Sequence, residues 1–441
     1  MTAPDLPAAD TRSQIRELAV WAGLVAAGLL LTAVAVAVGA RVGSSGAPFT
    51  GEYRFKIEIG TLLAPAVAVT VLAAVRAGLL DRLRWVPLLG VAYVAAVWWA
   101  LALALVDGGN GLADPVEASG EYLQDVGALD AGPAEFLRTF VANAESFSVA
   151  TRTHPPGPVL LLWLADRVGI DQPHTLGLLI TLLGCAYLPL VAIAVRSLCH
   201  ETAARRLLPV LVLAPYAVWL AVSMDAVTLT LAAAFVCCGV LGSERGRTWW
   251  WSVGCGLLLG TAALFNYAVA WLAVSVIAAY FVRRRPLLNL ITAAAGLLPL
   301  VLFQLWGFTW ASGLSAAQAD FSIRVGPERS WALWAALDVL LLLIACGPTI
   351  VRAARRIRLT PGWPFLAGAG LAVVFAVASG LSRGEVERSW LPFFPWLLVP
   401  AVAPSRRPAP GEPDAGPTPY LLIAAGAIGA VVVEAVLRST W

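Results

Sequence analysis

The first residues suited to chemistry are the carboxylates of a polar stretch between Asp107 and Asp130. Asp107, Glu121 and Asp125 belong to it, and Asp107 stands directly at the end of an apolar run. A carboxylate that is partly desolvated beside a membrane has a raised pKa, which lets it act as a general base near neutral pH. We predict a catalytic base among these three residues, with Asp107 and Asp125 favoured over Glu121. A solvated acidic surface is the alternative reading of the same pattern.

A second segment, Thr153-His154-Pro155-Pro156-Gly157, carries one of only three histidines in the chain. Proline fixes φ and suits the first turn of a helix, so the segment would present His154 and a helix N-terminus rigidly to an anionic group. We predict that His154 binds substrate. An ordinary helix start would have the same sequence.

Asp225 follows Ser223 in a short polar break between two apolar runs. An acid at a membrane boundary needs a partner or a function. We predict a substrate-binding role for Asp225, although either residue could instead cap the next helix.

The last polar segment contains Glu385, Glu387, Arg388 and Trp390, and it leads into an aromatic-rich apolar run. A guanidinium binds phosphate oxygens through two parallel hydrogen bonds, and tryptophan is enriched at the membrane interface. We predict that these four residues bind substrate, with Arg388 on a lipid phosphate. Pairing of the two glutamates with nearby arginines and ordinary snorkelling of Arg388 remain open.

The composition shows what kind of chain positions these residues. Of the 441 residues, 59% are hydrophobic and only 13% are charged, and the mean hydropathy is +0.80. This composition excludes soluble and disordered classes, and apolar runs of about 20 residues can cross a bilayer only as helices. The expected class is therefore an all-α, polytopic membrane protein.

Other classes of function receive little support from the sequence. The net charge of +3 is too small for a nucleic-acid partner, and the six cysteines lie in or beside apolar runs without a zinc-binding spacing. No metal and no cofactor are predicted.

Apolar windows bounded by charges, glycine and proline predict about thirteen transmembrane helices. They lie near residues 18–40, 59–77, 86–106, 175–196, 207–222, 226–243, 249–264, 266–282, 286–306, 331–350, 363–381, 389–404 and 419–437.

Clusters of arginine between these runs fall on one side of the membrane, which is therefore predicted to be cytoplasmic. The acidic loop then lies outside and carries two juxtamembrane helices, because the apolar stretch Pro158–Ala165 is too short to span. A weaker helical stretch, 116–143, should break near residues 130–133 at glycine and proline.

This topology divides the chain into six parts in the inner (plasma) membrane, with the N-terminus cytoplasmic and the C-terminus extracytoplasmic. They are a cytoplasmic N-terminus (1–17), three transmembrane helices (18–106), the outer loop (107–174), a transmembrane bundle (175–404), a cytoplasmic linker (405–418) and a last transmembrane helix (419–441).

The layout resembles the GT-C superfamily of membrane glycosyltransferases, which includes protein O-mannosyltransferases and lipid A aminoarabinose transferases. The acidic stretch from Asp107 to Asp125, His154-Pro155-Pro156-Gly157, Asp225 and the segment from Arg388 to Pro392 look like parts of that family's outer-face site. The resemblance covers about residues 86–404. The chain departs from it in having two more spans before the loop and in lacking the usual Asp-Asp or Asp-Glu pair. Its richness in alanine, arginine and tryptophan suggests a high-GC organism such as an actinobacterium.

The resemblance implies an inverting glycosyltransferase that uses a polyprenyl-phosphate-linked sugar and an acceptor glycan, lipid or protein of the cell envelope. Asp107 or Asp125 would be the base, Arg388 or another outer arginine would meet the phosphate, and Asp225 and His154 would orient the substrates. Two other classes remain open: a transporter or flippase, in which Asp338 is the one deep intramembrane acid, and a catalytically silent lipid-binding assembly protein.

Overall fold

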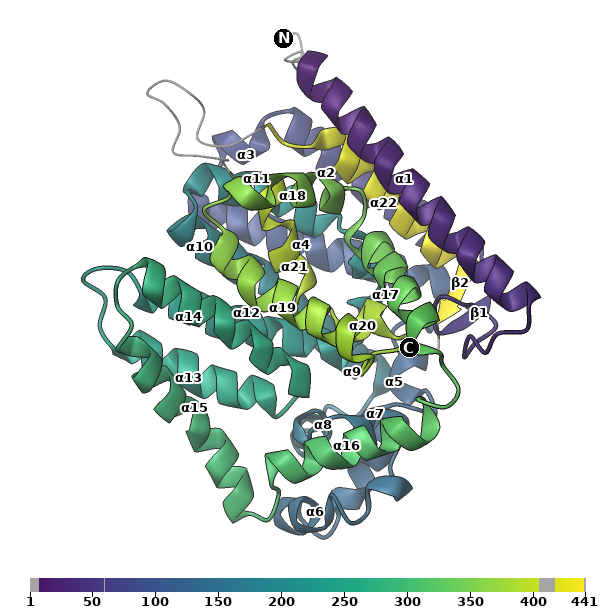
Figure 1. The fold of residues 1–441 in the computed structure, drawn as a ribbon, viewed down its shortest axis with the longest axis vertical. Coiled ribbons are helices and arrows are strands. Elements are labelled where there is room, and N and C mark those ends of the chain that lie inside the picture. Colours follow the sequence, from purple (N-terminus) through teal and green to yellow (C-terminus); the bar gives the residue numbers. More distant parts are fainter. Residues whose placement is uncertain (1–7, 59, 404–416, 440–441) are drawn as a thin grey trace.

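The computed structural model describes residues 8–58, 60–403 and 417–439, which are mostly helical (Figure 1). The first half contains α1 (Ala8–Ala37), α2 (Gly60–Arg76), α3 (Leu79–Arg82), α4 (Trp85–Ala104), α5 (Asp114–Glu117), α6 (Pro133–Thr139), α7 (Val149–Thr153), α8 (Gly157–Arg167), α9 (Pro173–Cys185), α10 (Tyr187–Leu198) and α11 (Glu201–Val212). The second half contains α12 (Met224–Gly242), α13 (Trp250–Ala263), α14 (Ala273–Val282), α15 (Leu288–Leu305), α16 (Trp310–Arg324), α17 (Trp331–Cys346), α18 (Thr349–Arg356), α19 (Trp363–Ser379), α20 (Val386–Ser389), α21 (Phe394–Leu398) and α22 (Tyr420–Val436).

Shorter 3-10 turns join these helices. They are η1 (Leu105–Asp107), η2 (Tyr122–Leu129), η3 (Ala144–Ser146), η4 (Pro215–Trp219), η5 (Tyr267–Leu272), η6 (Ile357–Leu359) and η7 (Val399–Ala401). The linker predicted at residues 405–418 lies almost wholly outside the described residues, as do residues 1–7 of the predicted N-terminal segment.

The predicted count of about thirteen spans is not confirmed. Five helical segments of the described chain are long and apolar enough to cross a bilayer, or six if the bent pair α17 and α18, which meet at 104°, is one span. The five are Asp10–Ala37, Trp85–Asp107, Pro173–Leu198, Met224–Gly242 and Leu288–Leu305. Other apolar helices, such as Thr61–Arg76 and Tyr420–Val436, fall short of 18 residues.

Besides the bent pair in the window 331–350, two further predicted spans are not continuous helices. In the window 207–222, α11 ends at Val212 and Ala214 is extended before Pro215, because a residue that precedes proline avoids the α region. In the window 389–404, α20 ends at Ser389, and only the short α21 and η7 follow. Pro392, Pro395 and Pro400 lie inside that window and lack the N–H that a continuous helix needs.

The arginine-rich segments lie together at one end of the bundle. The ring of Trp85, at the start of α4, lies 4.7 Å from the guanidinium carbon of Arg196 and 5.8 Å from that of Arg205. Near the start of α1, Arg352 pairs with Asp10 at 3.0 Å and with Glu17 at 3.3 Å. We call this the basic end.

The helices α1, α4 and α22 run from the basic end to the opposite end, where the loop after α4 lies (Figure 1). Within that loop, the predicted break near residues 130–133 falls between η2 and α6. Pro158–Ala165 lies inside α8, whose 11 residues extend only about 16 Å and cannot span a bilayer. Aromatic side chains hold the loop together; Phe136, Phe140 and Phe147 pack against one another.

A two-stranded sheet departs from the all-α expectation. Strand β1 (Gly51–Tyr53) pairs antiparallel with β2 (Leu437–Ser439), with Glu52 opposite Arg438. The pairing continues beyond the strands, because the N–H groups of Arg54 and Lys56 donate to the carbonyls of Val436 and Ala435, both at 2.8 Å. We call residues 51–56 with 435–439 the ribbon.

Candidate functional site

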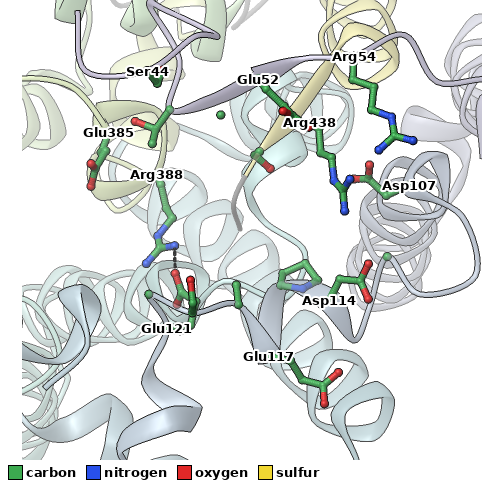
Figure 2. Close-up of a pocket in the computed structure, with 18 of the residues that line it drawn as sticks. Ser44, Glu52, Arg54, Asp107, Asp114, Glu117, Glu121, Glu385, Arg388 and Arg438 are labelled. Atoms are coloured by element: carbon green, nitrogen blue, oxygen red, sulfur yellow. Dashed lines mark hydrogen bonds and ion pairs between the residues drawn. The ribbon is translucent and has the colours of Figure 1, made fainter.

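A cavity of about 1240 Å³ opens at the end of the bundle opposite the basic end. Figure 2 shows side chains that line it. Its walls come from the segment 43–58, the loop segment 106–121, α7 with His154, the segment before α20, and the end of the ribbon. Segments more than 300 residues apart in sequence therefore meet in one place. This cavity is the candidate site.

Five of the nine residues predicted from the sequence line the cavity: Asp107, Glu121, His154, Glu385 and Arg388. The other four, Asp125, Asp225, Glu387 and Trp390, do not line it.

Arg388 lies in α20 and is held by two carboxylates. Its Nε donates to Asp225 Oδ2 at 2.7 Å and its Nη1 donates to Glu121 Oε1 at 2.5 Å. Burial alone would lower the pKa of Arg388, but the two carboxylates outweigh burial and raise it well above its ordinary value. Asp225 therefore reaches the cavity only through its contact with Arg388. The positive charge of Arg388 is balanced by the two carboxylates that hold it.

Tyr122 packs against this cluster and is 2% exposed. Burial raises its pKa well above the ordinary value, and the negative charge of Asp225 adds to the effect. Its ring meets that of His154 edge-on, with centroids 6.0 Å apart. Tyr122 thus joins the Arg388 cluster to the histidine.

His154 directly follows α7, and its Nδ1 lies 3.0 Å from the carbonyl of Ala150 and 3.1 Å from the hydroxyl of Thr153. At the start of the following helix, the Gly157 N–H donates to the Leu264 carbonyl at 2.9 Å and is therefore not available to an anion. A Cβ on Gly157 would lie 2.4 Å from that carbonyl oxygen, so glycine permits this close approach.

Asp107 ends η1 and forms a 2.6 Å ion pair with Lys56, the only lysine in the sequence. Lys56 also pairs with Glu434 of α22 at 3.2 Å. The Lys56 side chain is 9% exposed, whereas that of Asp107 is 31% exposed and faces the cavity. Asp107 is therefore both a structural anchor and an accessible carboxylate.

Asp125 accepts a hydrogen bond from the Ser148 N–H at 3.0 Å, and Ser148 in turn caps α7 by accepting from Thr151 N–H. The Asp125 side chain is buried and lies outside the cavity lining. Its position suits a structural role at the start of α7.

Glu387 accepts a hydrogen bond from the Thr50 N–H at 3.3 Å through Oε1, while its buried Oε2 has no partner among the described residues. Burial raises the pKa of Glu387 to about 7. Trp390 is 2% exposed and packs in the core of the bundle rather than at a lipid-facing surface.

The deep acid Asp338 of α17 accepts a hydrogen bond from the Gly384 N–H at 2.9 Å. It thus ties the segment before α20 to the bundle. Within residues 8–58, 60–403 and 417–439, no group of three or more histidine, cysteine or acidic side chains is placed to hold a metal ion.

Sequence reasoning missed the segment 43–58 and Arg438, which form most of one cavity wall. Lys56 could have been singled out from the sequence, because it is the only lysine and lies between two apolar runs. Arg54 and Arg438 had no such signal, since only the pairing of β1 with β2 brings them together.

No family model matches this chain, and no curated protein matches it. Two solved structures resemble it in fold. Both are ArnT from Cupriavidus metallidurans, at 18% sequence identity. The apo structure gives a TM-score of 0.44 and covers 64% of this chain and 54% of ArnT. The structure bound to undecaprenyl phosphate gives 0.45 and covers 70% and 59%. This chain thus matches less than two thirds of the length of ArnT.

Proposed function

We propose that the chain is an inverting membrane glycosyltransferase, which moves a sugar from a polyprenyl-phosphate donor to an acceptor on the extracytoplasmic face of the inner membrane. The main support for this proposal is the cavity at one end of an apolar helical bundle, which is lined by arginines and carboxylates. A volume of about 1240 Å³ has room for a sugar phosphate together with part of an acceptor.

The chemistry requires a carboxylate within reach of the acceptor. The acceptor hydroxyl oxygen forms a bond to the anomeric carbon as the bond from that carbon to the phosphate oxygen breaks. The lipid phosphate leaves with the electron pair, and the hydroxyl proton passes to the carboxylate. Asp107 and Glu121 are the predicted bases that line the cavity.

The remaining residues position these groups. Arg388 holds Glu121 and is itself held by Asp225. His154 and Glu385 line the cavity and are proposed to contact the substrates. The basic side chains among the cavity-lining residues, Arg54, Lys56, Arg388 and Arg438, would favour departure of the phosphate, because fixed positive charge stabilises the anion that develops. The acceptor would be a glycan, lipid or protein of the cell envelope.

The proposal is tested by sugar transfer from an undecaprenyl-phosphate-linked donor in proteoliposomes containing the full-length chain. Loss of a general base lowers the rate by roughly 10²- to 10⁴-fold. We expect that loss in either Asp107→Asn or Glu121→Gln, and a smaller change in Asp125→Asn. Transfer at the wild-type rate in both of the first two variants would refute the catalytic scheme.

A transporter would behave differently in the same vesicles. It would move the lipid-linked substrate without forming a covalent product, and Asp338→Asn would abolish that movement. Such a result would replace the glycosyltransferase by the transporter.

A further inference from the structure

The ribbon forms one wall of the cavity and carries cationic side chains that the scheme above leaves unused. Arg54, Lys56 and Arg438 all line the cavity. Figure 2 shows Arg54 and Arg438 extending toward the part of the cavity where Asp107 lies. Because Glu52 lies opposite Arg438 in the strand register, Arg438 sits only two residues from Arg54 along this edge.

The charge pairing in the cavity singles out two of its four arginine and lysine side chains. Arg388 is paired with Asp225 and Glu121, and Lys56 is paired with Asp107 and Glu434. For the other two, Arg54 and Arg438, no ion pair is recorded within the described part of the chain. Glu52 lies opposite Arg438 and also lines the cavity. An anion that enters therefore meets two ribbon arginines beside one ribbon carboxylate, and neither arginine is tied up in a recorded ion pair.

The backbone under these two arginines is held firmly. Besides the strand pairs, the N–H groups of Arg54 and Lys56 donate to carbonyls at the end of α22. The Tyr53 hydroxyl donates to the Ala47 carbonyl at 2.9 Å, and the Lys56 ion pairs tie the ribbon to η1 and α22. The arginines thus project from a fixed frame, which lowers the entropy lost on binding.

Apolar side chains alternate with these cations. Phe55 and Ile57 line the cavity beside Arg54 and Lys56, and each is 72% exposed. Leu62, 76% exposed, follows in the first turns of α2. Exposed apolar side chains next to a cationic pair suit a ligand whose anionic group is attached to a hydrocarbon chain, rather than a free anion.

We propose that the ribbon binds the phosphate of a lipid monophosphate through Arg54 and Arg438, with Phe55 and Ile57 against the first part of the lipid chain. The inference rests on the proposed function, because it assigns the donor phosphate to particular residues. In this assignment Arg54 and Arg438 take the phosphate-binding role that the sequence analysis gave to Arg388, whose guanidinium already donates to two carboxylates.

Placing the lipid phosphate at the ribbon also distinguishes the roles of the two candidate bases, Asp107 and Glu121. In an inverting transfer, the acceptor attacks from the face opposite the leaving phosphate, and the base lies on the acceptor's side. Asp107 is next to Lys56 of the ribbon, on the phosphate side, whereas Glu121 lies across the cavity beside Arg388 (Figure 2). Glu121 is therefore the base, and Asp107 is a positioning residue for the ribbon.

The test is binding of undecaprenyl phosphate, undecaprenol and inorganic phosphate to the full-length chain in detergent, measured by native mass spectrometry. The wild type should bind undecaprenyl phosphate at least tenfold more tightly than either of the others. In R54Q/R438Q this preference should fall by roughly tenfold or more, because two charge-assisted hydrogen-bonding groups are lost. R54K/R438K should keep part of it.

Arg41→Gln is the matched control. Arg41 is an exposed arginine outside the cavity lining, paired with Glu328, so its loss should leave the preference unchanged. A wild-type preference in R54Q/R438Q would overturn the assignment to the ribbon while leaving the proposed function standing. Equal binding of undecaprenyl phosphate and undecaprenol by the wild type would overturn both the inference and the donor class. Equal binding of inorganic phosphate would overturn the lipid assignment alone.

Discussion

Arg388 shows how far a single residue can be interpreted from sequence. Its position before an aromatic-rich run predicts an arginine at a membrane boundary, and the structure places it at the cavity. Its partners could not be predicted, because Glu121 and Asp225 are 267 and 163 residues away. The sequence therefore pointed to the arginine, whereas the two acids that hold it are seen only in the structure.

The charges of this cluster depend on one another. Arg388→Met should destabilise the protein by about 3–5 kcal/mol, because Asp225, 3% exposed, would be left as an unpaired buried carboxylate. Thermal unfolding in detergent measures the loss. The triple change with Glu121→Gln and Asp225→Asn should recover much of it. A triple variant no more stable than Arg388→Met would contradict this account.

Glu387 gives a prediction on pH. Burial raises its pKa in the folded protein to about 7 from an ordinary 4.5, so folding disfavours the charged form. This penalty is absent below about pH 4.5, grows between the two values, and is full above about pH 7. It amounts to roughly 3 kcal/mol for such a shift. Glu387→Gln should therefore raise the unfolding temperature at pH 8 but not at pH 4.

The exposed neighbour Glu385 is the control for this titration. Its side chain is 42% exposed and lies 3.7 Å from Arg329. Glu385→Gln should give no comparable gain at pH 8. A gain in Glu387→Gln that is equal at both pH values would show that the carboxylate is not the cause.

At the scale of elements, the sequence predicted the helices best where long apolar runs end at polar or charged residues. The predictions 226–243 and 286–306 lie within two residues of α12 and α15. The prediction of one continuous helix over 389–404 was wrong, because the apolar composition of the window does not reveal that Pro392, Pro395 and Pro400 break the helix. The ribbon has three residues in each strand, which is too short for a period to be seen, and its register is set by tertiary contacts.

Gly51 tests whether the ribbon is needed as an element. Its φ is +146°, and a Cβ would lie 2.4 Å from the Arg438 carbonyl oxygen. Gly51→Ala should separate β1 from β2 and weaken binding of undecaprenyl phosphate by roughly tenfold, as the loss of both arginines would. Gly109→Ala is the control, because a Cβ there meets nothing within 4 Å. Unchanged binding in Gly51→Ala would show that the ribbon's pairing is dispensable.

At the scale of the whole molecule, the cavity-lining residues come together because particular ends of the helices lie side by side. Alternation of arginine-rich and acidic loops predicted that Asp107, His154 and Arg388 share one side. The structure places all three at one cavity, opposite the basic end. The cavity's second wall escaped prediction, because the segment 43–58 and Arg438 carry no motif.

The last prediction concerns the side of the membrane on which the cavity opens, since transfer from a polyprenyl-phosphate donor is proposed for the outer face. Ser119 is exposed and lines the cavity, whereas Arg245 is exposed in the loop between α12 and α13, near the basic end. In intact cells, a membrane-impermeant maleimide should label Ser119→Cys, and it should reach Arg245→Cys only after permeabilisation. The six native cysteines are buried or partly buried and should contribute little background. Labelling in the reverse order would place the cavity in the cytoplasm, where a transferase with a cytosolic donor would fit better than the one proposed.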